Sequence, residues 1–312
     1  MTLPVAVTGG SGFIGREVVR CLLAEGFAVR ALMRRRIPEL ERCGVTVVRG
    51  SLESDAALRE LVADVAAVVH CAGAVAAPSA TAFSDVNARG SARLVAAVTA
   101  TPRPARVLLL SSLAAREPEV SPYARSKREA EEVVRRCAAE GLEVSILRPP
   151  AVYGPGDRAT LPIFRQLRSG RLLVPAVSAA RFSLLYVSDL AGAIIWLLGA
   201  PAWNGEVLEL DDGRVGGYRW RDLAEIAGRQ LGRPVRTIPL PWSLLWPAAA
   251  VAALGGAALG RAPPLSPGKL RELFHADWVA RPRSALPGWA PRTTFEDGFA
   301  QTMAWYRQQG WL

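Results

Sequence analysis

The first fifteen residues constrain the fold more than any other stretch of the chain. An apolar run, Pro4–Val7, is long enough for one buried parallel strand, and it is followed directly by the glycine-rich segment Thr8–Gly12. Apolar residues then resume at helical spacing from Phe13 onward. A strand, a glycine-rich turn and a helix in this order form the setting of a dinucleotide phosphate site.

Three glycines in this segment have distinct predicted roles. Gly9 permits the tight turn, and Gly12 removes a side chain where a pyrophosphate would approach the backbone. Gly15 lets the helix pack closely on the strand, while the N–H groups at the helix start face the phosphates. Glycine also marks ordinary turns, so the flanking strand and helix give this motif its weight.

The composition is that of a globular chain with an excess of positive charge. Its 312 residues, half of them apolar and 21% charged, suffice for one large domain or a domain with a smaller lobe. The formal net charge of +10 favours an anionic partner such as a phosphate or an anionic membrane, or else reflects an arginine-rich surface. Because no basic tract is interleaved with aromatic residues, we expect no nucleic-acid partner.

Cysteines and histidines point to a cytoplasmic protein without a metal. None of the four cysteines belongs to a Cys-x-x-Cys pair, and several lie in apolar runs, as expected of reduced thiols. Because the first strand begins at once, we expect no signal peptide. The two histidines, His70 and His275, form no cluster with metal-ligand spacing, so no metal site is predicted.

Strands and helices alternate through the first half of the chain. The pattern predicts strands at 28–33, 45–49, 65–70, 106–110 and 143–147, and helices at 13–25, 55–62 and 80–99. This alternation predicts an α/β fold with a doubly wound parallel sheet, the Rossmann type. We expect a nucleotide-binding domain at 1–150 and a smaller substrate-binding lobe at 151–312, with a strand and helix near 182–198 returning to the first domain.

The end of the strand at 28–33 bears on the choice of dinucleotide. In this fold the residue at that position meets the adenosine ribose, and an acidic residue there binds the 2′-hydroxyl. This chain instead has Arg34, Arg35 and Arg36. Arginine suits a 2′-phosphate, which it can bind through two hydrogen bonds, although a charged loop would look the same.

A tyrosine and a lysine four residues apart, Tyr123 and Lys127, would share one face of a predicted helix. An ammonium beside a phenol favours the phenolate and lowers its pKa. With a serine hydroxyl to hold the substrate oxygen, the pair would form a proton-transfer site for a carbonyl or alcohol. Taken alone, the two side chains could equally be ordinary exposed helix residues.

The stretch from Pro239 to Gly260 carries no charge and is rich in alanine and leucine. Its length approaches that of a membrane span, but its prolines and glycines weaken that interpretation. Peripheral contact with a membrane surface and a helix lining an apolar substrate pocket are the two alternatives. We expect the segment to cover a substrate pocket without crossing a bilayer.

Together these motifs resemble the extended short-chain dehydrogenase/reductase family, of the epimerase/dehydratase type. Thr8–Gly15 resembles its phosphate loop, and Tyr123 with Lys127 matches its tyrosine–lysine pair. The segment from Arg148 to Asp157 resembles the part that crosses over the nicotinamide. Further matching segments are 86–90, 186–190 and 288–306.

The resemblance implies roles for individual residues. Tyr123 would be the general acid/base, Lys127 would bind the nicotinamide ribose, and Ser112, with Ser111 as the alternative, would orient the substrate oxygen. Asn87 takes the place of a structural asparagine that we group with the catalytic residues. The implied cofactor-binding residues are Gly9, Gly12, Phe13, Ile14, Gly15, Arg34, Arg35, Ser51, Leu52, Cys71, Ala72, Gly73, Ser111, Tyr123, Lys127, Pro149 and Val152.

The resemblance also has departures that narrow the expected function. Ser51 stands where family members often have an aspartate near the adenine, and 175–182 lacks the pattern typical of nucleotide-sugar enzymes. The apolar segment 239–260 makes the chain more similar to the 3-beta-hydroxysteroid dehydrogenase and dihydroflavonol reductase branch.

We therefore expect an oxidoreductase that transfers a hydride between a nicotinamide cofactor, NADP(H) in preference to NAD(H), and a ketone or secondary alcohol of an apolar small molecule. The alternatives are a nucleotide-sugar epimerase or dehydratase with tightly bound NAD, and a non-catalytic dinucleotide-binding sensor or assembly protein. Contact with a membrane surface and a homodimer are both compatible with the sequence.

Overall fold

The computed structural model describes residues 3–35, 37–263 and 265–312. The chain forms two compact units. The first consists of the chain up to Arg148 together with Ala191–Leu208, and the second of Pro149–Leu190 together with Glu209–Leu312. The chain passes from the first unit to the second after Arg148, close to the boundary predicted at residue 150.

A seven-stranded sheet forms the centre of the first unit, in the order β11-β6-β5-β4-β1-β2-β3. Its strands are β1 (Val5–Thr8), β2 (Val29–Met33), β3 (Thr46–Arg49), β4 (Ala67–His70), β5 (Arg106–Leu110), β6 (Val144–Arg148) and β11 (Asn204–Glu209). Strand β1 pairs in parallel with β2 on one side and β4 on the other. The strand order reverses at this point, and doubly wound folds bind ligands there, beyond the carboxyl ends of the strands.

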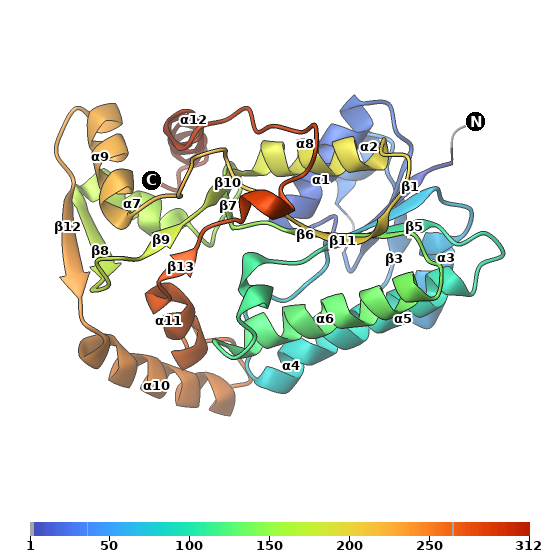
Figure 1. Ribbon diagram of the computed structural model, residues 1–312, viewed down its shortest axis with the longest axis horizontal. Helices are drawn as coiled ribbons and strands as arrows, with labels where there is room; N and C mark the ends of the chain where they lie inside the picture. The colour runs from blue at the N-terminus through green and yellow to red at the C-terminus, as the bar shows by residue number, and fades with distance from the viewer. Residues whose placement is uncertain (1–2, 36, 264) are drawn as a thin grey trace. The chain divides into compact units, whose positions relative to one another are not determined.

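Helices cover both faces of this sheet (Figure 1). They are α1 (Phe13–Ala24), α2 (Pro38–Arg42), α3 (Asp55–Val62), α4 (Ala80–Ser84), α5 (Gly90–Thr99), α6 (Pro122–Ala139) and α8 (Val187–Leu198), with a π-helical turn at Asp85–Arg89 and a 3₁₀ turn at Leu113–Arg116. Buried side chains of α3, α5 and α6, such as Leu58, Leu94 and Val134, share one apolar core with the strands. Helix α1 turns Val18, Val19 and Leu22 inward at the spacing that the sequence predicts.

The second unit has short strands and a core rich in aromatic rings. Its strands pair in parallel as β7 (Ala151–Tyr153) with β10 (Leu184–Tyr186), β8 (Arg171–Pro175) with β12 (Arg236–Leu240), and β9 (Arg181–Phe182) with β13 (Asp277–Trp278). Its helices are α7 (Leu161–Ser169), α9 (Trp220–Leu231), α10 (Trp242–Ala258), α11 (Pro267–Phe274) and α12 (Phe295–Gln308), with a 3₁₀ turn at Pro282–Ser284.

Tyr153 lies in the middle of this aromatic core. Its ring stacks on Phe164 at 6.2 Å between centroids and meets the rings of Tyr186 and Phe295 edge-on. Phe164 in turn stacks on Phe299 of α12 at 5.4 Å. Aromatic packing of this kind binds α7, β7, β10 and α12 into one unit.

Two details of the fold differ from the sequence prediction. The segment that returns to the first unit is Ala191–Leu208, which contains most of α8 and of β11, whereas the strand predicted near 182–187 stays in the second unit. Strand β10 stays because Tyr186 packs against Tyr153 in the aromatic core and its hydroxyl bonds to Gln301 of α12. In addition, a π-helical turn at Asp85–Arg89 interrupts the single helix predicted at 80–99.

Within the described part of the chain, no helix combines the length and the apolar character that crossing a membrane requires. The apolar segment predicted at 239–260 forms α10, a helix of 17 residues with Pro247 inside it. The interpretation of this segment as a membrane span is therefore not supported by the structure.

Candidate active site

The glycine-rich loop after β1 has the close packing that a phosphate cradle requires. Gly9 has a φ of +71°, which favours glycine, and a Cβ at this position would lie 2.7 Å from the backbone nitrogen of Ala72. A Cβ on Gly15 would lie 2.1 Å from the carbonyl oxygen of Gly9. Any side chain at Gly9 or Gly15 would therefore displace the loop, as the roles predicted for these two glycines demand.

The start of α1 is suited to an anion. Gly12 is the N-cap of the helix, so no side chain caps the first N–H groups, and the first turn contains no acidic residue. Phe13 and Ile14 are the first two helical residues, so their backbone N–H groups belong to this uncapped turn. The loop and helix therefore fit the pyrophosphate of a dinucleotide, which would bind to backbone N–H groups and to the positive end of the helix.

Lys127 is buried in α6, with 7% of its surface exposed. Its ammonium donates a hydrogen bond to the carbonyl oxygen of Leu110, at the end of β5, over 2.9 Å. Burial lowers the pKa of Lys127 to about 8, so the side chain is still mainly charged at neutral pH. The ammonium is buried at the carboxyl end of the sheet and donates one hydrogen bond to the carbonyl of Leu110. Such a group can hold the hydroxyl groups of a ribose.

Tyr123 lies one turn before Lys127, in the first turn of α6. Ser121 caps that helix by accepting from the N–H of Ala124, and Pro122 begins it. The tyrosine is half-buried, and its ring meets Phe83 of α4 at 6.0 Å between centroids. Tyr123 and Lys127 therefore lie on neighbouring turns of one helix, as their spacing predicts.

The two adjacent serines after β5 have different surroundings. Ser111 is buried, and its hydroxyl donates to the carboxylate of Glu131, which is also ion-paired with Arg148. Ser112 is half-buried, and its oxygen accepts from the N–H of Ala114, an interaction that leaves its own proton available. This difference favours Ser112 over Ser111 as the serine that donates to a substrate oxygen.

Asn87 is buried inside the π-helical turn, and both the oxygen and the nitrogen of its side-chain amide form hydrogen bonds. Its Oδ1 accepts from the N–H of Ala74, and its Nδ2 donates to the carbonyl of Ala74 and to the hydroxyl of Ser126. Ser126 donates in turn to the carbonyl of Tyr123. Asn87 thus connects the loop after β4 to the first turn of α6, which gives it a positioning role.

A chain of buried hydrogen bonds, which the sequence analysis missed, begins at the phosphate loop. Ser91 donates to the carbonyl of Asn87 and therefore accepts from Nε2 of His70 over 3.0 Å. Nδ1 of His70 then accepts from the hydroxyl of Thr8 over 2.6 Å, and Thr8 accepts from the N–H of Ala72. Burial and the nearby charge of Lys127 lower the pKa of His70 to about 3, so the ring stays neutral.

One signal in the sequence could have found this chain. His70 is the polar end of an otherwise apolar strand, and a buried histidine needs partners for both ring nitrogens. The partners themselves, Thr8 and Ser91, lie far away along the sequence and could not be identified without the fold.

The small residues after β4 lie close to the lysine. A Cβ added to Gly73 would lie 3.1 Å from both the Lys127 ammonium and Oδ1 of Asn87. Cys71 and Ala72 precede this glycine, and burial raises the pKa of the Cys71 thiol to about 12. The thiol therefore stays protonated, and room for a ligand at the end of this strand stays a prediction.

Arg34 and Arg35 are both exposed directly after β2, which ends at Met33. Arg36, the third arginine of this run, lies outside the described residues. Ser51 accepts from the N–H of Glu53, while the side chain of Leu52 is buried in the apolar core beneath Gly90. The side chain of Leu52 is therefore not available for the predicted cofactor contact, which stays a prediction for its backbone.

The two predicted cofactor residues from the crossing segment belong to the second unit. Pro149 is buried, and Val152 lies in β7, where it pairs with Leu185 of β10. Their contact with a cofactor stays a prediction.

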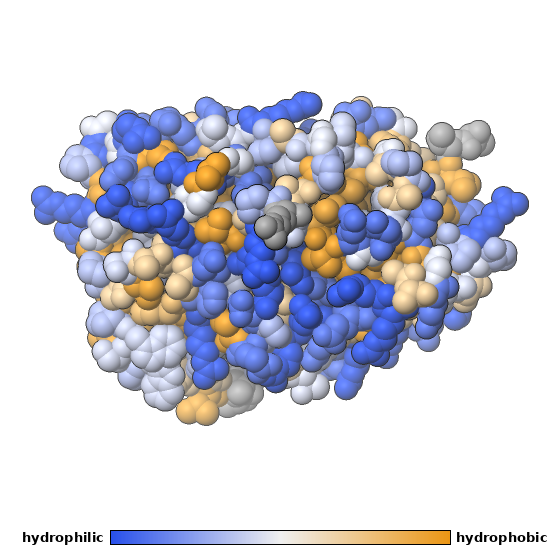
Figure 2. Space-filling view, viewed as in Figure 1, coloured by the Kyte–Doolittle hydropathy of each residue, from blue (hydrophilic) through white to orange (hydrophobic). Residues whose placement is uncertain are grey.

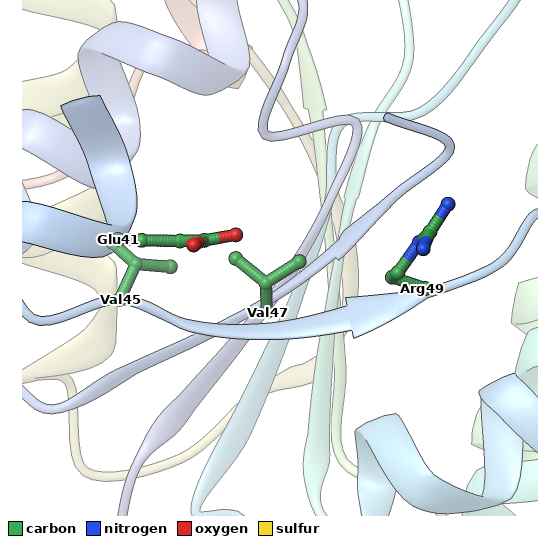
Figure 3. A pocket seen from close by; sticks show the side chains of 4 residues that line it. All are labelled: Glu41, Val45, Val47 and Arg49. Carbon is green, nitrogen blue, oxygen red and sulfur yellow. The ribbon is translucent and has the colours of Figure 1, made fainter. Parts of the chain in front are cut away.

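A shallow pocket on the edge strand of the first unit lies away from these residues (Figure 3). It is lined by Glu41 of α2 and by Val45, Val47 and Arg49, which stand on one side of β3 and the residue before it. None of the predicted site residues lines it, so we assign it no function. Within residues 3–35, 37–263 and 265–312, no group of three or more His, Cys, Asp or Glu residues could hold a metal ion.

Comparison with known proteins extends over the whole chain. The model of the NAD dependent epimerase/dehydratase family matches residues 5–210. The chain is 36% identical to the ceramide reductase of Caulobacter vibrioides over 311 residues, which cover 99% of this chain and 96% of that protein. It is 31% identical to the 2-alkyl-3-oxoalkanoate reductase of Stenotrophomonas maltophilia over 208 residues, or 61% and 63% of the two chains.

A solved structure of UDP-glucuronic acid 4-epimerase from Bacillus cereus, in complex with UDP-glucuronic acid and NAD, has the same fold. Its TM-score is 0.74 at 17% identity, with 98% of this chain and all of that chain covered.

Proposed function

The chain belongs to the NAD dependent epimerase/dehydratase family, and we propose that it is an NADP(H)-dependent reductase of a ketone on a lipid-like substrate. The observation that carries this proposal is its 36% identity with a ceramide reductase over 99% of the chain. That similarity includes residues beyond 210, where the match to the family model ends.

The residues that would hold the cofactor lie at the carboxyl end of the sheet. Backbone N–H groups at the start of α1 would bind the pyrophosphate, and the ammonium of Lys127 would bind the nicotinamide ribose. Arg34 is the first residue after β2 and would reach a 2′-phosphate first, with Arg35 beside it. No acidic residue occurs between Gly26 and Pro38 to bind a free 2′-hydroxyl, which supports NADP(H).

The chemistry of the chain's own residues is proton transfer. When bound, the reduced nicotinamide supplies a hydride to the carbonyl carbon of the ketone. Tyr123 supplies the proton from its phenol to the carbonyl oxygen, so that the ketone becomes a secondary alcohol. Ser112 donates a hydrogen bond to the same oxygen. The positive charge of Lys127 stabilises the phenolate that forms when Tyr123 loses its proton.

A panel of substrates tests this proposal. Purified protein and NADPH are mixed with a ceramide whose sphingoid hydroxyl has been oxidised to a ketone, with a 2-alkyl-3-oxoalkanoate, and with UDP-glucose. We expect NADPH oxidation with the ceramide ketone. Conversion of UDP-glucose by protein that retains NAD, with no net oxidation, would contradict the proposal and identify an epimerase.

Two adjacent variants test the assignment of the serine. Ser112→Ala should lower turnover of the ceramide ketone, because the substrate oxygen loses a donor, while Ser111→Ala should mainly lower stability, because Glu131 loses a buried partner. If Ser111→Ala has the larger effect on turnover at full stability, the roles of the two serines are reversed.

A further inference from the structure

Helix α10 exposes an apolar face. Leu244, Val251 and Leu254 are 61%, 70% and 74% exposed, and they follow one another at the spacing of a single helix face. Pro247 has the same spacing and is also exposed. Leu259, just after the helix, is exposed as well. Contiguous exposed apolar residues of this kind mark an interaction surface.

The opposite side of α10 attaches the helix to its own unit. Ala249 is fully buried, and the ring of Trp242 meets Phe274 of α11 edge-on at 5.3 Å between centroids. The helix is thus apolar on both sides, with one side packed and the other open. Figure 2 shows pale and orange residues at the lower left, over α10. The open side needs an apolar environment that this unit does not supply.

The charges that flank α10 along the sequence are of one sign. Between Glu225 and Glu272 the chain has no acidic residue, but it has six basic ones: Arg229, Arg233, Arg236, Arg261, Lys269 and Arg271. All six are exposed. Arg229 and Lys269 form ion pairs with Glu296 and Glu272, whereas no ion pair with a described residue is found for the other four.

An apolar helix that is flanked in the sequence by exposed basic residues matches the surface of an anionic bilayer. Apolar side chains enter the boundary between headgroups and acyl chains, and arginines bind the lipid phosphates. A second copy of this chain fits less well, because a symmetric contact through α10 would bring the two sets of basic residues together.

We propose that α10 docks the protein on anionic membranes, with Leu244, Val251 and Leu254 in the interface and Arg236, Arg261 and Arg271 near the lipid phosphates. The helix lies in the plane of the interface and does not cross the bilayer. Docking of this kind would bring the protein to the surface that holds a lipid substrate. The docking does not depend on the proposed reaction, because vesicle binding is measured without turnover.

Vesicle flotation tests the proposal with the full chain. The wild type should bind vesicles that contain phosphatidylglycerol and should bind phosphatidylcholine vesicles much less. The double variant Leu244→Asp/Leu254→Asp should bind the anionic vesicles at least about tenfold more weakly, since two apolar side chains no longer enter the interface. Arg261→Glu/Arg271→Glu should remove the preference for phosphatidylglycerol.

A matched control is Val215→Asp, which introduces the same charge at a residue that is 99% exposed in another part of the unit. This variant should bind like the wild type, and the thermal transitions of all variants should match. No wild-type binding to anionic vesicles, or equal binding by the α10 variants, would overturn the proposal. A lipid-free dimer that Leu244→Asp/Leu254→Asp dissociates would also overturn it, and would assign the face to a second copy.

Discussion

The two units of the protein differ in the side chains that their tertiary structure brings together. The first unit buries polar side chains at the carboxyl end of its sheet, where Thr8, His70, Asn87 and Lys127 each have specific hydrogen-bond partners. The second unit fills its centre with aromatic rings and leaves large apolar side chains of α10 exposed. A buried polar network determines the positions of a few atoms, whereas aromatic packing mainly determines stability. We therefore expect turnover to depend on the polar network of the first unit and stability on the aromatic core of the second. Variants in each unit can test this separation.

The largest expected effect is on turnover and comes from a single oxygen atom in the first unit. Tyr123→Phe keeps the ring against Phe83 but removes the phenol that would transfer the proton. We expect turnover to fall about 10²–10⁴-fold, with nearly unchanged cofactor affinity. Steady-state rates and NADPH binding measured on the same preparation check both expectations. Wild-type turnover by this variant would mean that another group transfers the proton.

The next effect is on stability and comes from the second unit. Phe164→Ala removes a ring that stacks on Tyr153 and Phe299 and meets Tyr306 edge-on. We expect the free energy of unfolding to fall by about 3–5 kcal/mol in chemical denaturation. NADPH affinity at low denaturant should match the wild type. An equal loss of cofactor affinity would break the proposed separation between packing and chemistry.

A smaller effect concerns the choice of cofactor. Arg34→Asp should erase or reverse a preference for NADPH over NADH that we expect to be about ten- to hundredfold, because a charge-assisted hydrogen bond is worth about 1.5–3 kcal/mol. Arg35→Asp is the matched control and should have the weaker effect, because Arg34 directly follows β2. Titration of both cofactors against each variant measures this. Tighter binding of NADH than of NADPH by the wild type would refute the assignment.

The smallest effect comes from the hydrogen-bond chain through His70. The pKa of His70 is about 3 in the folded protein and about 6.5 in the unfolded chain. Between pH 3 and pH 6.5, therefore, only the unfolded state takes up a proton on this imidazole. The contribution of His70 to stability is therefore present above pH 6.5 and is lost as the pH falls toward 3. His70→Asn should cost about 1–3 kcal/mol at neutral pH and make the decline between these pH values shallower. An unchanged pH dependence in denaturant titrations would exclude this role.

The parallel sheet and the phosphate loop could be predicted from the sequence because their signals are local. Apolar runs, glycine positions and helix periodicity each depend on residues a few positions apart. The helix at 55–62 and the strand at 106–110 have the predicted bounds, and Met33 ends its strand as expected. The spacing that brings Tyr123 and Lys127 onto neighbouring turns is equally local.

Other features depended on contacts between residues far apart in the chain. The sequence alone left Ser111 and Ser112 open, because the difference between them is a bond to Glu131, twenty residues further on. The π-helical turn around Asn87 carries a side chain whose partners, Ala74 and Ser126, lie 13 and 39 residues away. His70 acquires its partners only when β1, β4 and α5 come together.

The region of α10 also has one property that the local sequence determines and another that depends on tertiary contacts. Composition alone established that residues 239–260 are apolar and uncharged, which is a property of the residues themselves. Which side of the helix packs and which side is exposed was decided by the tertiary structure, because the helix is apolar all round and its sequence has no polar stripe to orient it. The contact of Trp242 with Phe274 of α11 selects the packed side, and Leu244, Val251 and Leu254 are left exposed.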